Sequence, residues 1–301
     1  MPRPCVSLRP LRAEAGPAAL LLAAALLLAG CSSPPARPPS PTQALASAGS
    51  ERGARALQRS DWPQALAQYQ ATLQAAVALQ DPALTGAALI GLSVVQARLG
   101  ALDAANAQVD QILARPAYFE AGLQARAAAR KAVLALDGPQ PADALRWADR
   151  AEGLCAAPCA LAPLLGNLRA QAALARGDGA TAAALAQAAA RAAEAAGQDG
   201  EWASALRLQA RALGLSGQSG QSGQSGQADQ AAAALALALQ IDRRLGQPDR
   251  VALDLLLAAE VEDRRGRFEA ATDLLQRALA VYSASGDARQ ADAVRQRLAG
   301  R

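Results

Sequence analysis

The chain has 301 residues, of which 52% are hydrophobic but only 3% are aromatic, and its formal net charge is +4. This length suffices for a sizeable core. A core that lacks aromatic side chains has to be filled by Ala, Leu and Val, which favours closely packed helices over a β-sandwich. Because the sequence contains no histidine, a Ser-His-Asp or Cys-His catalytic arrangement, a histidine-ligated zinc and a histidine proton shuttle are all excluded.

Residues 1–30 have the parts of a secretory signal peptide. Arg3, Arg9 and Arg12 form a positive region, and an apolar run follows from Ala18 to Ala29. This run is too short for the roughly twenty residues that a membrane-spanning helix needs. We therefore expect a targeting segment that is removed, and no other stretch of the sequence is predicted to span a membrane.

The signal segment ends in Leu28-Ala29-Gly30-Cys31. This motif resembles the lipobox of bacterial lipoproteins, which implies that the Cys31 thiol receives a lipid and that cleavage makes Cys31 the first residue. An ordinary signal peptide with a chance cysteine is the alternative. In Gram-negative lipoproteins an aspartate after the lipidated cysteine retains the protein at the inner membrane. By the same resemblance, Ser32 in that place implies the periplasmic side of the outer membrane.

The mature chain is expected to consist of a tether and a helical body. Residues 31–45 are rich in proline, which favours an extended polyproline conformation, and residues 46–301 are the predicted repeat domain. Loss of Arg3, Arg9, Arg12 and Glu14 removes +2, which leaves a formal charge of about +2. So small a charge argues against nucleic acid as a partner and leaves the lipid as the only expected membrane contact.

A repeated pattern of small and large residues runs through the body. The segment Asp61–Tyr69 recurs in outline at Ala101–Val109, Gln140–Ala148 and Arg265–Leu279. The small positions are Ala65, Ala105, Ala144, about Ala184, about Ala232 and Ala271, at spacings of 40, 39, 40, 48 and 39 residues. The long spacing contains a Ser-Gly-Gln tract over residues 216–227, which we predict to be a flexible loop.

Each unit is predicted to be a pair of antiparallel helices. The small residues allow close approach of two helices, while Tyr69, Val109 and Leu275, four positions further on, fill the gap on the same helical face. Asp287–Ala299 reads as a final amphipathic helix with Ala288, Ala291, Val294 and Leu298 on one side, suited to cap an exposed end.

The pattern around Gly266, Phe268 and Ala271 resembles the second half of a tetratricopeptide repeat. A period near forty is longer than the usual 34, so the resemblance is to long-period members of the family. It implies an all-α protein: a right-handed superhelical solenoid of helix pairs that binds other proteins.

Cys155 and Cys159 are separated by three residues at the junction of the third and fourth units. Thioredoxin-like motifs have two intervening residues, and a zinc site needs further ligands, so redox and metal roles are less favoured. In an oxidising periplasm a structural disulfide is the preferred interpretation.

The groove lined by the first helices is the predicted binding surface. Its candidate lining consists of arginines: Arg126, Arg130, Arg169, Arg176, Arg207 and Arg211. They would suit an acidic or C-terminal carboxylate ligand, although the solvated stripe of six amphipathic helices is the favoured explanation of them. Trp62, Trp147 and Trp202 are interpreted as core residues.

No pattern in the sequence predicts an enzyme. Glu260 and Asp263 lie beside Arg264 and Arg265 and are interpreted as surface ion-pairing residues rather than an acid-base dyad. We find no phosphate-binding loop and no nucleophile elbow, so no cofactor, metal or small-molecule substrate is expected. The prediction is a scaffold for unidentified proteins of an envelope assembly, secretion or pilus system; the alternative is a regulator of peptidoglycan synthases or hydrolases.

Overall fold

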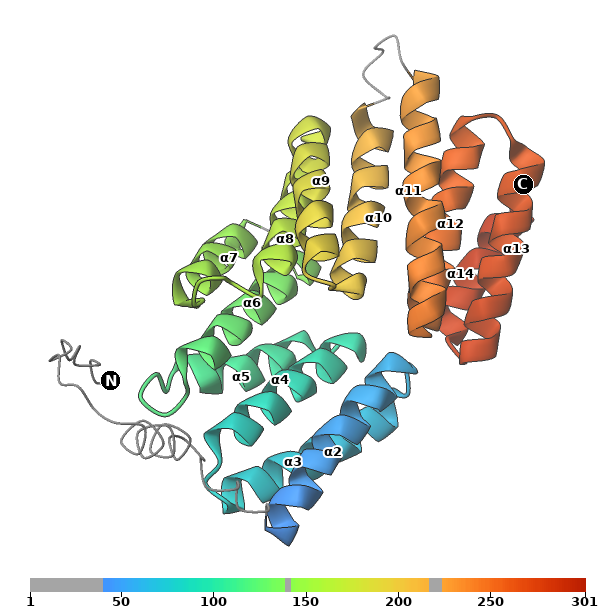
Figure 1. Cartoon of the computed structure of the whole chain (residues 1–301). Helices are drawn as coiled ribbons and strands as arrows, with labels where there is room; N and C mark the ends of the chain where they lie inside the picture. The colour runs from blue at the N-terminus through green and yellow to red at the C-terminus, as the bar shows by residue number, and fades with distance from the viewer. Residues whose placement is uncertain (1–39, 139–141, 217–223) are drawn as a thin grey trace, which may run out of the picture. The chain divides into compact units, whose positions relative to one another are not determined.

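The computed structural model describes residues 40–138, 142–216 and 224–301, and within these ranges the chain is all-helical, without strands. Figure 1 shows the helices following one another in chain order. They are α2 (Pro41–Gln58), α3 (Trp62–Ala78), α4 (Pro82–Arg98), α5 (Leu102–Leu113), α6 (Ala121–Asp137), α7 (Asp143–Leu154), α8 (Ala162–Ala175), α9 (Gly179–Ala195), α10 (Asp199–Ser216), α11 (Gln224–Leu245), α12 (Pro248–Arg264), α13 (Phe268–Ser285) and α14 (Ala288–Ala299).

Short polar turns separate the helices. Aspartates cap several N-termini: Asp61 and Asp81, for example, accept a hydrogen bond from the backbone N–H of Gln64 and Leu84. Gly100 and Gly266 follow helix ends with φ of 82° and 71°, a conformation that glycine adopts without the steric cost a Cβ would add. Most helices have 17 or 18 residues, close to half of a forty-residue unit with its turns, whereas α5, α7 and α14 have 12 and α11 has 22.

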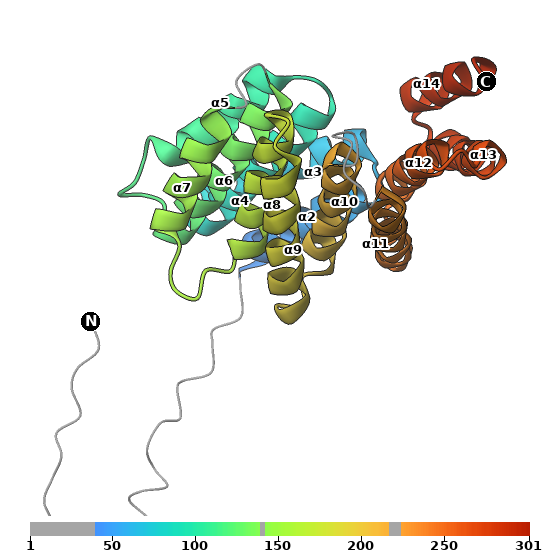
Figure 2. The ribbon, with the colours of Figure 1, turned by 90° about the horizontal axis from the view of Figure 1, so that it is seen from above.

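The core is divided among consecutive groups of three helices. One cluster of buried side chains joins α2, α3 and α4, the next joins α4, α5 and α6, and the pattern continues to α12, α13 and α14. We number the pairs along the chain as α2/α3, α4/α5 and so on to α12/α13, and call the two members of a pair its first and second helix. The first helix of each pair also contacts the first helix of the next pair, from α2 and α4 through to α10 and α12. In the described part of the chain the second helices make no such contacts with one another, so the first helices form a continuous row (Figures 1 and 2).

Most of the predicted small positions are buried. Ala65, Ala105, Ala144 and Ala271 are at most 1% exposed. The two approximate positions were wrong by one or two residues, since Ala184 is exposed and Ala232 half-buried, whereas Ala182 and Ala231 are core residues. The reason is physical: in α9 and α11 alanines stand on the exposed and on the buried face alike, so an alanine by itself does not mark the buried face, although Leu235 and Ile241 of α11 are buried.

Two predicted boundaries differ from the structure. Helix α2 begins at Pro41, after an N-cap at Ser40, so residues 41–45 are helical instead of belonging to the tether. Proline is compatible with the first turn of a helix because its missing N–H would have no partner there. Helix α11 begins at Gln224, so the end of the predicted loop 216–227 is helical, while residues 217–223 lie outside the described part.

The C-terminal elements follow the expected pattern, with different ion-pair partners. In α14, Ala291 and Val294 are buried against the last helix pair. Glu260 and Asp263 do form ion pairs, but not with the neighbouring Arg264 and Arg265: Arg297 lies 3.2 Å from Glu260 and 3.5 Å from Asp263, and Arg301 also pairs with Asp263. The three tryptophans are half-buried at the edges of their clusters. No helix in the described ranges is long and apolar enough to cross a membrane.

Candidate binding site

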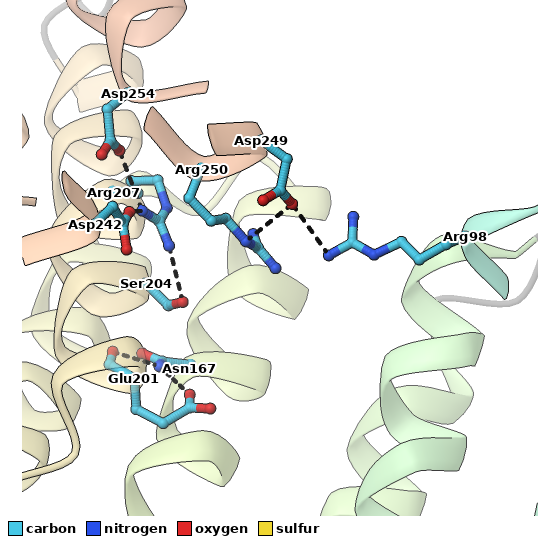
Figure 3. Close-up of polar contacts among 9 residues, drawn as sticks. All are labelled: Arg98, Asn167, Glu201, Ser204, Arg207, Asp242, Asp249, Arg250 and Asp254. Atoms are coloured by element: carbon cyan, nitrogen blue, oxygen red, sulfur yellow. Dashed lines mark hydrogen bonds and ion pairs between the residues drawn. The ribbon is translucent and has the colours of Figure 1, made fainter. Parts of the chain in front are cut away.

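A buried arginine joins three successive helices. Arg207 of α10 is only 5% exposed, and its partners Asp242 of α11 and Asp254 of α12 are at most 1% exposed (Figure 3). Its Nη1 donates to Asp242 and, at 3.1 Å, to Oδ1 of Asp254, while Nη2 donates to Oγ of Ser204 at 3.0 Å. The helical period alone would place apolar residues at these two aspartate positions, because Asp242 lies four residues after the buried Ala238 and Asp254 stands in a leucine run.

Two carboxylates surround this one guanidinium. Burial raises the pKa of Asp254 to about 7; the charge of Arg207 acts against the shift and the adjacent Asp242 adds to it. One oxygen of each carboxylate, Oδ1 of Asp242 and Oδ2 of Asp254, has no hydrogen-bond partner. A proton on Asp254 therefore reduces the negative charge that faces Arg207.

The cluster borders a cavity of about 500 Å³. Four first helices line it: α6, α8, α10 and α12. Its apolar wall consists of Val133, Leu164, Leu168, Leu208, Leu253 and Leu257. Its polar wall consists of Asn167, Gln171, Glu201, Ser204, Arg207, Arg211, Arg250 and Glu260. An apolar surface with a few convergent polar groups is the usual composition of a binding site.

The polar wall of this cavity is partly fixed by hydrogen bonds. Asn167 is 5% exposed, and its Nδ2 donates to the backbone oxygen of Glu201 at 3.0 Å and to its Oε2 at 2.9 Å. These two acceptors determine the orientation of the amide and tie α8 to α10. Glu260 forms an ion pair with Arg297. Both carboxylates of the wall, Glu201 and Glu260, therefore already have a side-chain partner within the protein.

A second, smaller cavity shares Arg250 with the first. Its volume is about 190 Å³, and its lining is Leu57, Gln58, Trp62, Val94, Arg98, Gln247, Asp249 and Arg250. Arg98 of α4 and Arg250 of α12 both lie 3.8 Å from the same oxygen of Asp249 (Figure 3). Arg98 also lies over the Trp62 ring, 5.8 Å from its centre.

Positive charges act on one another at this second cavity. Burial lowers the pKa of Arg250, and the charges of Arg207 and Arg98 lower it further, against the carboxylates of Asp249 and Asp242. Because Arg98 and Arg250 share one carboxylate, some of their N–H groups remain available to donate to another anion.

The structure separates the six predicted arginines. Arg207 and Arg211 line the large cavity, although Arg207 is committed to its two aspartates. Arg126 and Arg176 are exposed and outside both cavities. The other two are engaged elsewhere, as their contacts show.

Arg130 donates to Oγ and to the backbone oxygen of Ser93 at 3.1 and 3.0 Å, and burial lowers its pKa to about 10. Arg169 is turned toward α7, where it pairs with Asp149 at 2.8 Å and Glu152 at 2.6 Å. The hydrogen bond to Asp149 is the main reason that the pKa of Arg169 is raised. These two guanidinium groups stabilise contacts between helices rather than line a cavity.

The structure describes the predicted disulfide but not the predicted lipidation residue. Cys155 and Cys159 lie between α7 and α8 in disulfide geometry, with Cα atoms 5.4 Å apart. Cys31 lies outside the described residues. Within the described ranges no group of three side chains could hold a metal ion.

Sequence reasoning missed four of the central residues: Arg98, Asp242, Arg250 and Asp254. The aspartates carried a signal, because Asp254 stands inside an apolar run and Asp242 lies four residues after the buried Ala238, and a charge at such a position is unexpected unless it is paired. Arg98 and Arg250 carried none, since they are far apart in the sequence. Comparison of the sequence with protein-family models and with curated proteins finds no match, so the site itself has to support the functional argument.

Proposed function

We propose that this protein is an outer-membrane lipoprotein of the tetratricopeptide type that acts as a non-catalytic scaffold in the periplasm. The observation that carries the proposal is the cavity lined by the first helices of four successive pairs, with an aliphatic wall and arginines at its edge. Repeat proteins bind partners on such a continuous inner surface. We further propose that the pairs wind into a right-handed superhelix, as the resemblance implies.

The polar groups of the cavity favour binding over catalysis. Arg207 is neutralised by two aspartates, Glu201 is hydrogen-bonded to Asn167, and Glu260 is paired with Arg297. These groups form a pre-organised wall against which an extended segment of another protein can pack. The partner would be a protein of an envelope assembly, secretion or pilus system.

Site-specific photo-cross-linking in cells tests this function. Lys131 is the sole lysine and is held by Asp110 at 2.9 Å, so amine-reactive reagents are unsuitable. A photoreactive phenylalanine at Gln171, in the cavity wall on α8, should cross-link one envelope protein. The same residue at Gln187, exposed on the second helix of that pair, is the matched control. Equal cross-linking from both positions, or none from Gln171, would overturn the proposed binding surface.

Lipidation is tested separately by labelling cells with a radioactive fatty acid. The wild-type chain should incorporate label, and Cys31→Ala should abolish incorporation and leave the signal segment uncleaved. The variant Ser32→Asp should still be labelled but fractionate with the inner membrane. Unchanged labelling of Cys31→Ala would contradict the lipoprotein assignment without affecting the argument about the cavity.

A further inference from the structure

Arg98 and Arg250 lie on two helices whose backbones do not pack against each other. Among the described residues, α4 and α12 make no close backbone contact, yet these side chains meet at Asp249. The Arg98 and Asp249 side chains are 43% and 26% exposed. Their 3.8 Å separation is longer than the 2.7–2.9 Å of a charge-assisted hydrogen bond. Asp249 thus holds Arg98 and Arg250 only at long range, and both guanidinium groups can still bind a further anion.

The charges near this pair leave it electropositive. Arg207 is matched by Asp242 and Asp254, so Asp249 is the carboxylate left to serve both Arg98 and Arg250. Burial lowers the pKa of Arg250 most, and repulsion from Arg207 and Arg98 lowers it further; an anion that enters between the arginines relieves this repulsion. A carboxylate suits the planar donor groups of two guanidinium ions.

The neighbouring large cavity shows what the rest of the ligand must be. Arg250 belongs to both cavities, and Leu253, one helical turn further along α12, lines the aliphatic wall. A ligand that used both cavities would therefore carry a negative charge close to an aliphatic side chain. A protein segment has both, whereas an inorganic anion would leave the leucine-lined cavity empty.

We propose that the two cavities form one composite site for an acidic, amphipathic segment of a partner protein, with a carboxylate between Arg98 and Arg250 and an aliphatic side chain against Leu253 and Leu257. The inference rests on the proposed scaffold function and specifies its ligand. It also makes α4 and α12 joint contributors, so the bound carboxylate connects the first half of the helical row to its last pair.

Selection from a random dodecapeptide phage library against the purified full chain tests the composite site. Enriched peptides should contain an aspartate or glutamate within a few residues of leucine, isoleucine or valine. In a synthetic version of the best peptide, replacing that acid by its amide should weaken binding to the wild type about tenfold, as expected for loss of a charged hydrogen bond.

Two arginine variants and one matched control locate the contact. Arg98→Gln and Arg250→Gln should each weaken the acidic peptide about tenfold and leave the amide peptide unchanged. Arg277→Gln is the control, because Arg277 is 44% exposed, also has one carboxylate partner, and lies on α13 away from both cavities. If Arg250→Gln fails to fold, as judged by circular dichroism, Arg98→Gln alone decides the question.

The outcomes separate this inference from the proposed function. Peptides that bind without an acid, or that bind all variants equally, would overturn the composite site while leaving a scaffold with a different ligand. Enrichment of basic peptides would also overturn it. If no peptide is enriched and cross-linking from Gln171 captures no protein, the scaffold function itself fails.

Discussion

Arg207 is almost entirely removed from water, and Asp242 and Asp254 beside it are buried more deeply still. Breaking a buried ion pair from one side costs about 3–5 kcal/mol, because an uncompensated charge is left behind. We expect Arg207→Met to lower the free energy of unfolding in urea by about that amount. Arg211→Met, four residues further along α10 and exposed, should change it by less than about 0.5 kcal/mol. Equal effects would contradict the buried cluster.

The raised pKa of Asp254 predicts that the stability of the protein depends on pH. Its pKa in the folded protein, about 7, lies above the unfolded value of about 3.9. Between these values the folded state holds more protons than the unfolded state, so stability falls as the pH rises through about 7. Urea unfolding should show a loss on the order of 2–4 kcal/mol between pH 5 and pH 8.

Asp254→Asn isolates this contribution, because asparagine resembles the protonated acid in shape and can donate to Asp242. Its stability should change much less between pH 5 and pH 8 than that of the wild type. Asp292→Asn on α14 is the control and should keep the wild-type slope, since Asp292 is exposed and its ion pair is with the exposed Arg295. A wild-type slope in Asp254→Asn would assign the pH dependence to other groups.

At the scale of helices, Tyr69 shows how one pair stacks on the next. Its ring, on α3, lies against Gly53 of α2 and Gly91 of α4, and a Cβ added at Gly91 would come within 2.4 Å of it. Overpacking of this kind costs about 1–3 kcal/mol. Gly91→Ala should therefore lower the free energy of unfolding by up to about 2 kcal/mol in thermal or urea denaturation, because a gain of up to about 1 kcal/mol in helix propensity offsets part of the overpacking.

Gly153→Ala on α7 is the matched control, because a Cβ there would have no atom within 4 Å. It should stabilise the protein by up to about 1 kcal/mol through helix propensity alone. If both substitutions stabilise, the close approach of Tyr69 to α4 is not maintained in solution.

The helices and their pairing could be predicted because the information is local. Asp61 and Gly100 mark helix boundaries through capping and turn geometry, and Ala65 followed by Tyr69 marks a buried face. The direction of individual arginines could not be predicted. A small rotation of a helix decides whether a side chain such as Arg169 faces a cavity or the preceding helix, and long polar side chains do not constrain that rotation.

The candidate site depends on distant parts of the chain, which explains why only part of it was predicted. Arg207 and Arg211 lie where the first helices were expected to form a groove. The pairing of Arg207 with Asp242 and Asp254 depends on how α10, α11 and α12 pack, and the meeting of Arg98 with Asp249 depends on the cumulative geometry of all intervening helices. No local pattern encodes either contact.

Across the whole helical body, stability is distributed over successive small cores instead of one centre. The first helices from α4 to α12 each belong to at least two clusters, whereas α2 and α14 each belong to one and stand at the ends of the row, where no further helix of the described part covers them. Stability in such arrays is approximately the sum of local and nearest-neighbour contributions. Hydrogen exchange followed by mass spectrometry should therefore find the fastest amide exchange in α2 and α14 and the slowest in α6 to α10.

Two core substitutions test whether the coupling is local. Leu165→Ala, in the cluster of α6, α7 and α8, should speed exchange mainly in those helices, whereas Val294→Ala should do so only in α12, α13 and α14. Both remove buried methyl groups, so the comparison concerns position rather than chemistry. If either variant speeds exchange uniformly, the body unfolds as one cooperative unit. In that case the Arg98–Asp249 contact, which connects α4 directly to α12, would have to contribute far more than an exposed ion pair normally does.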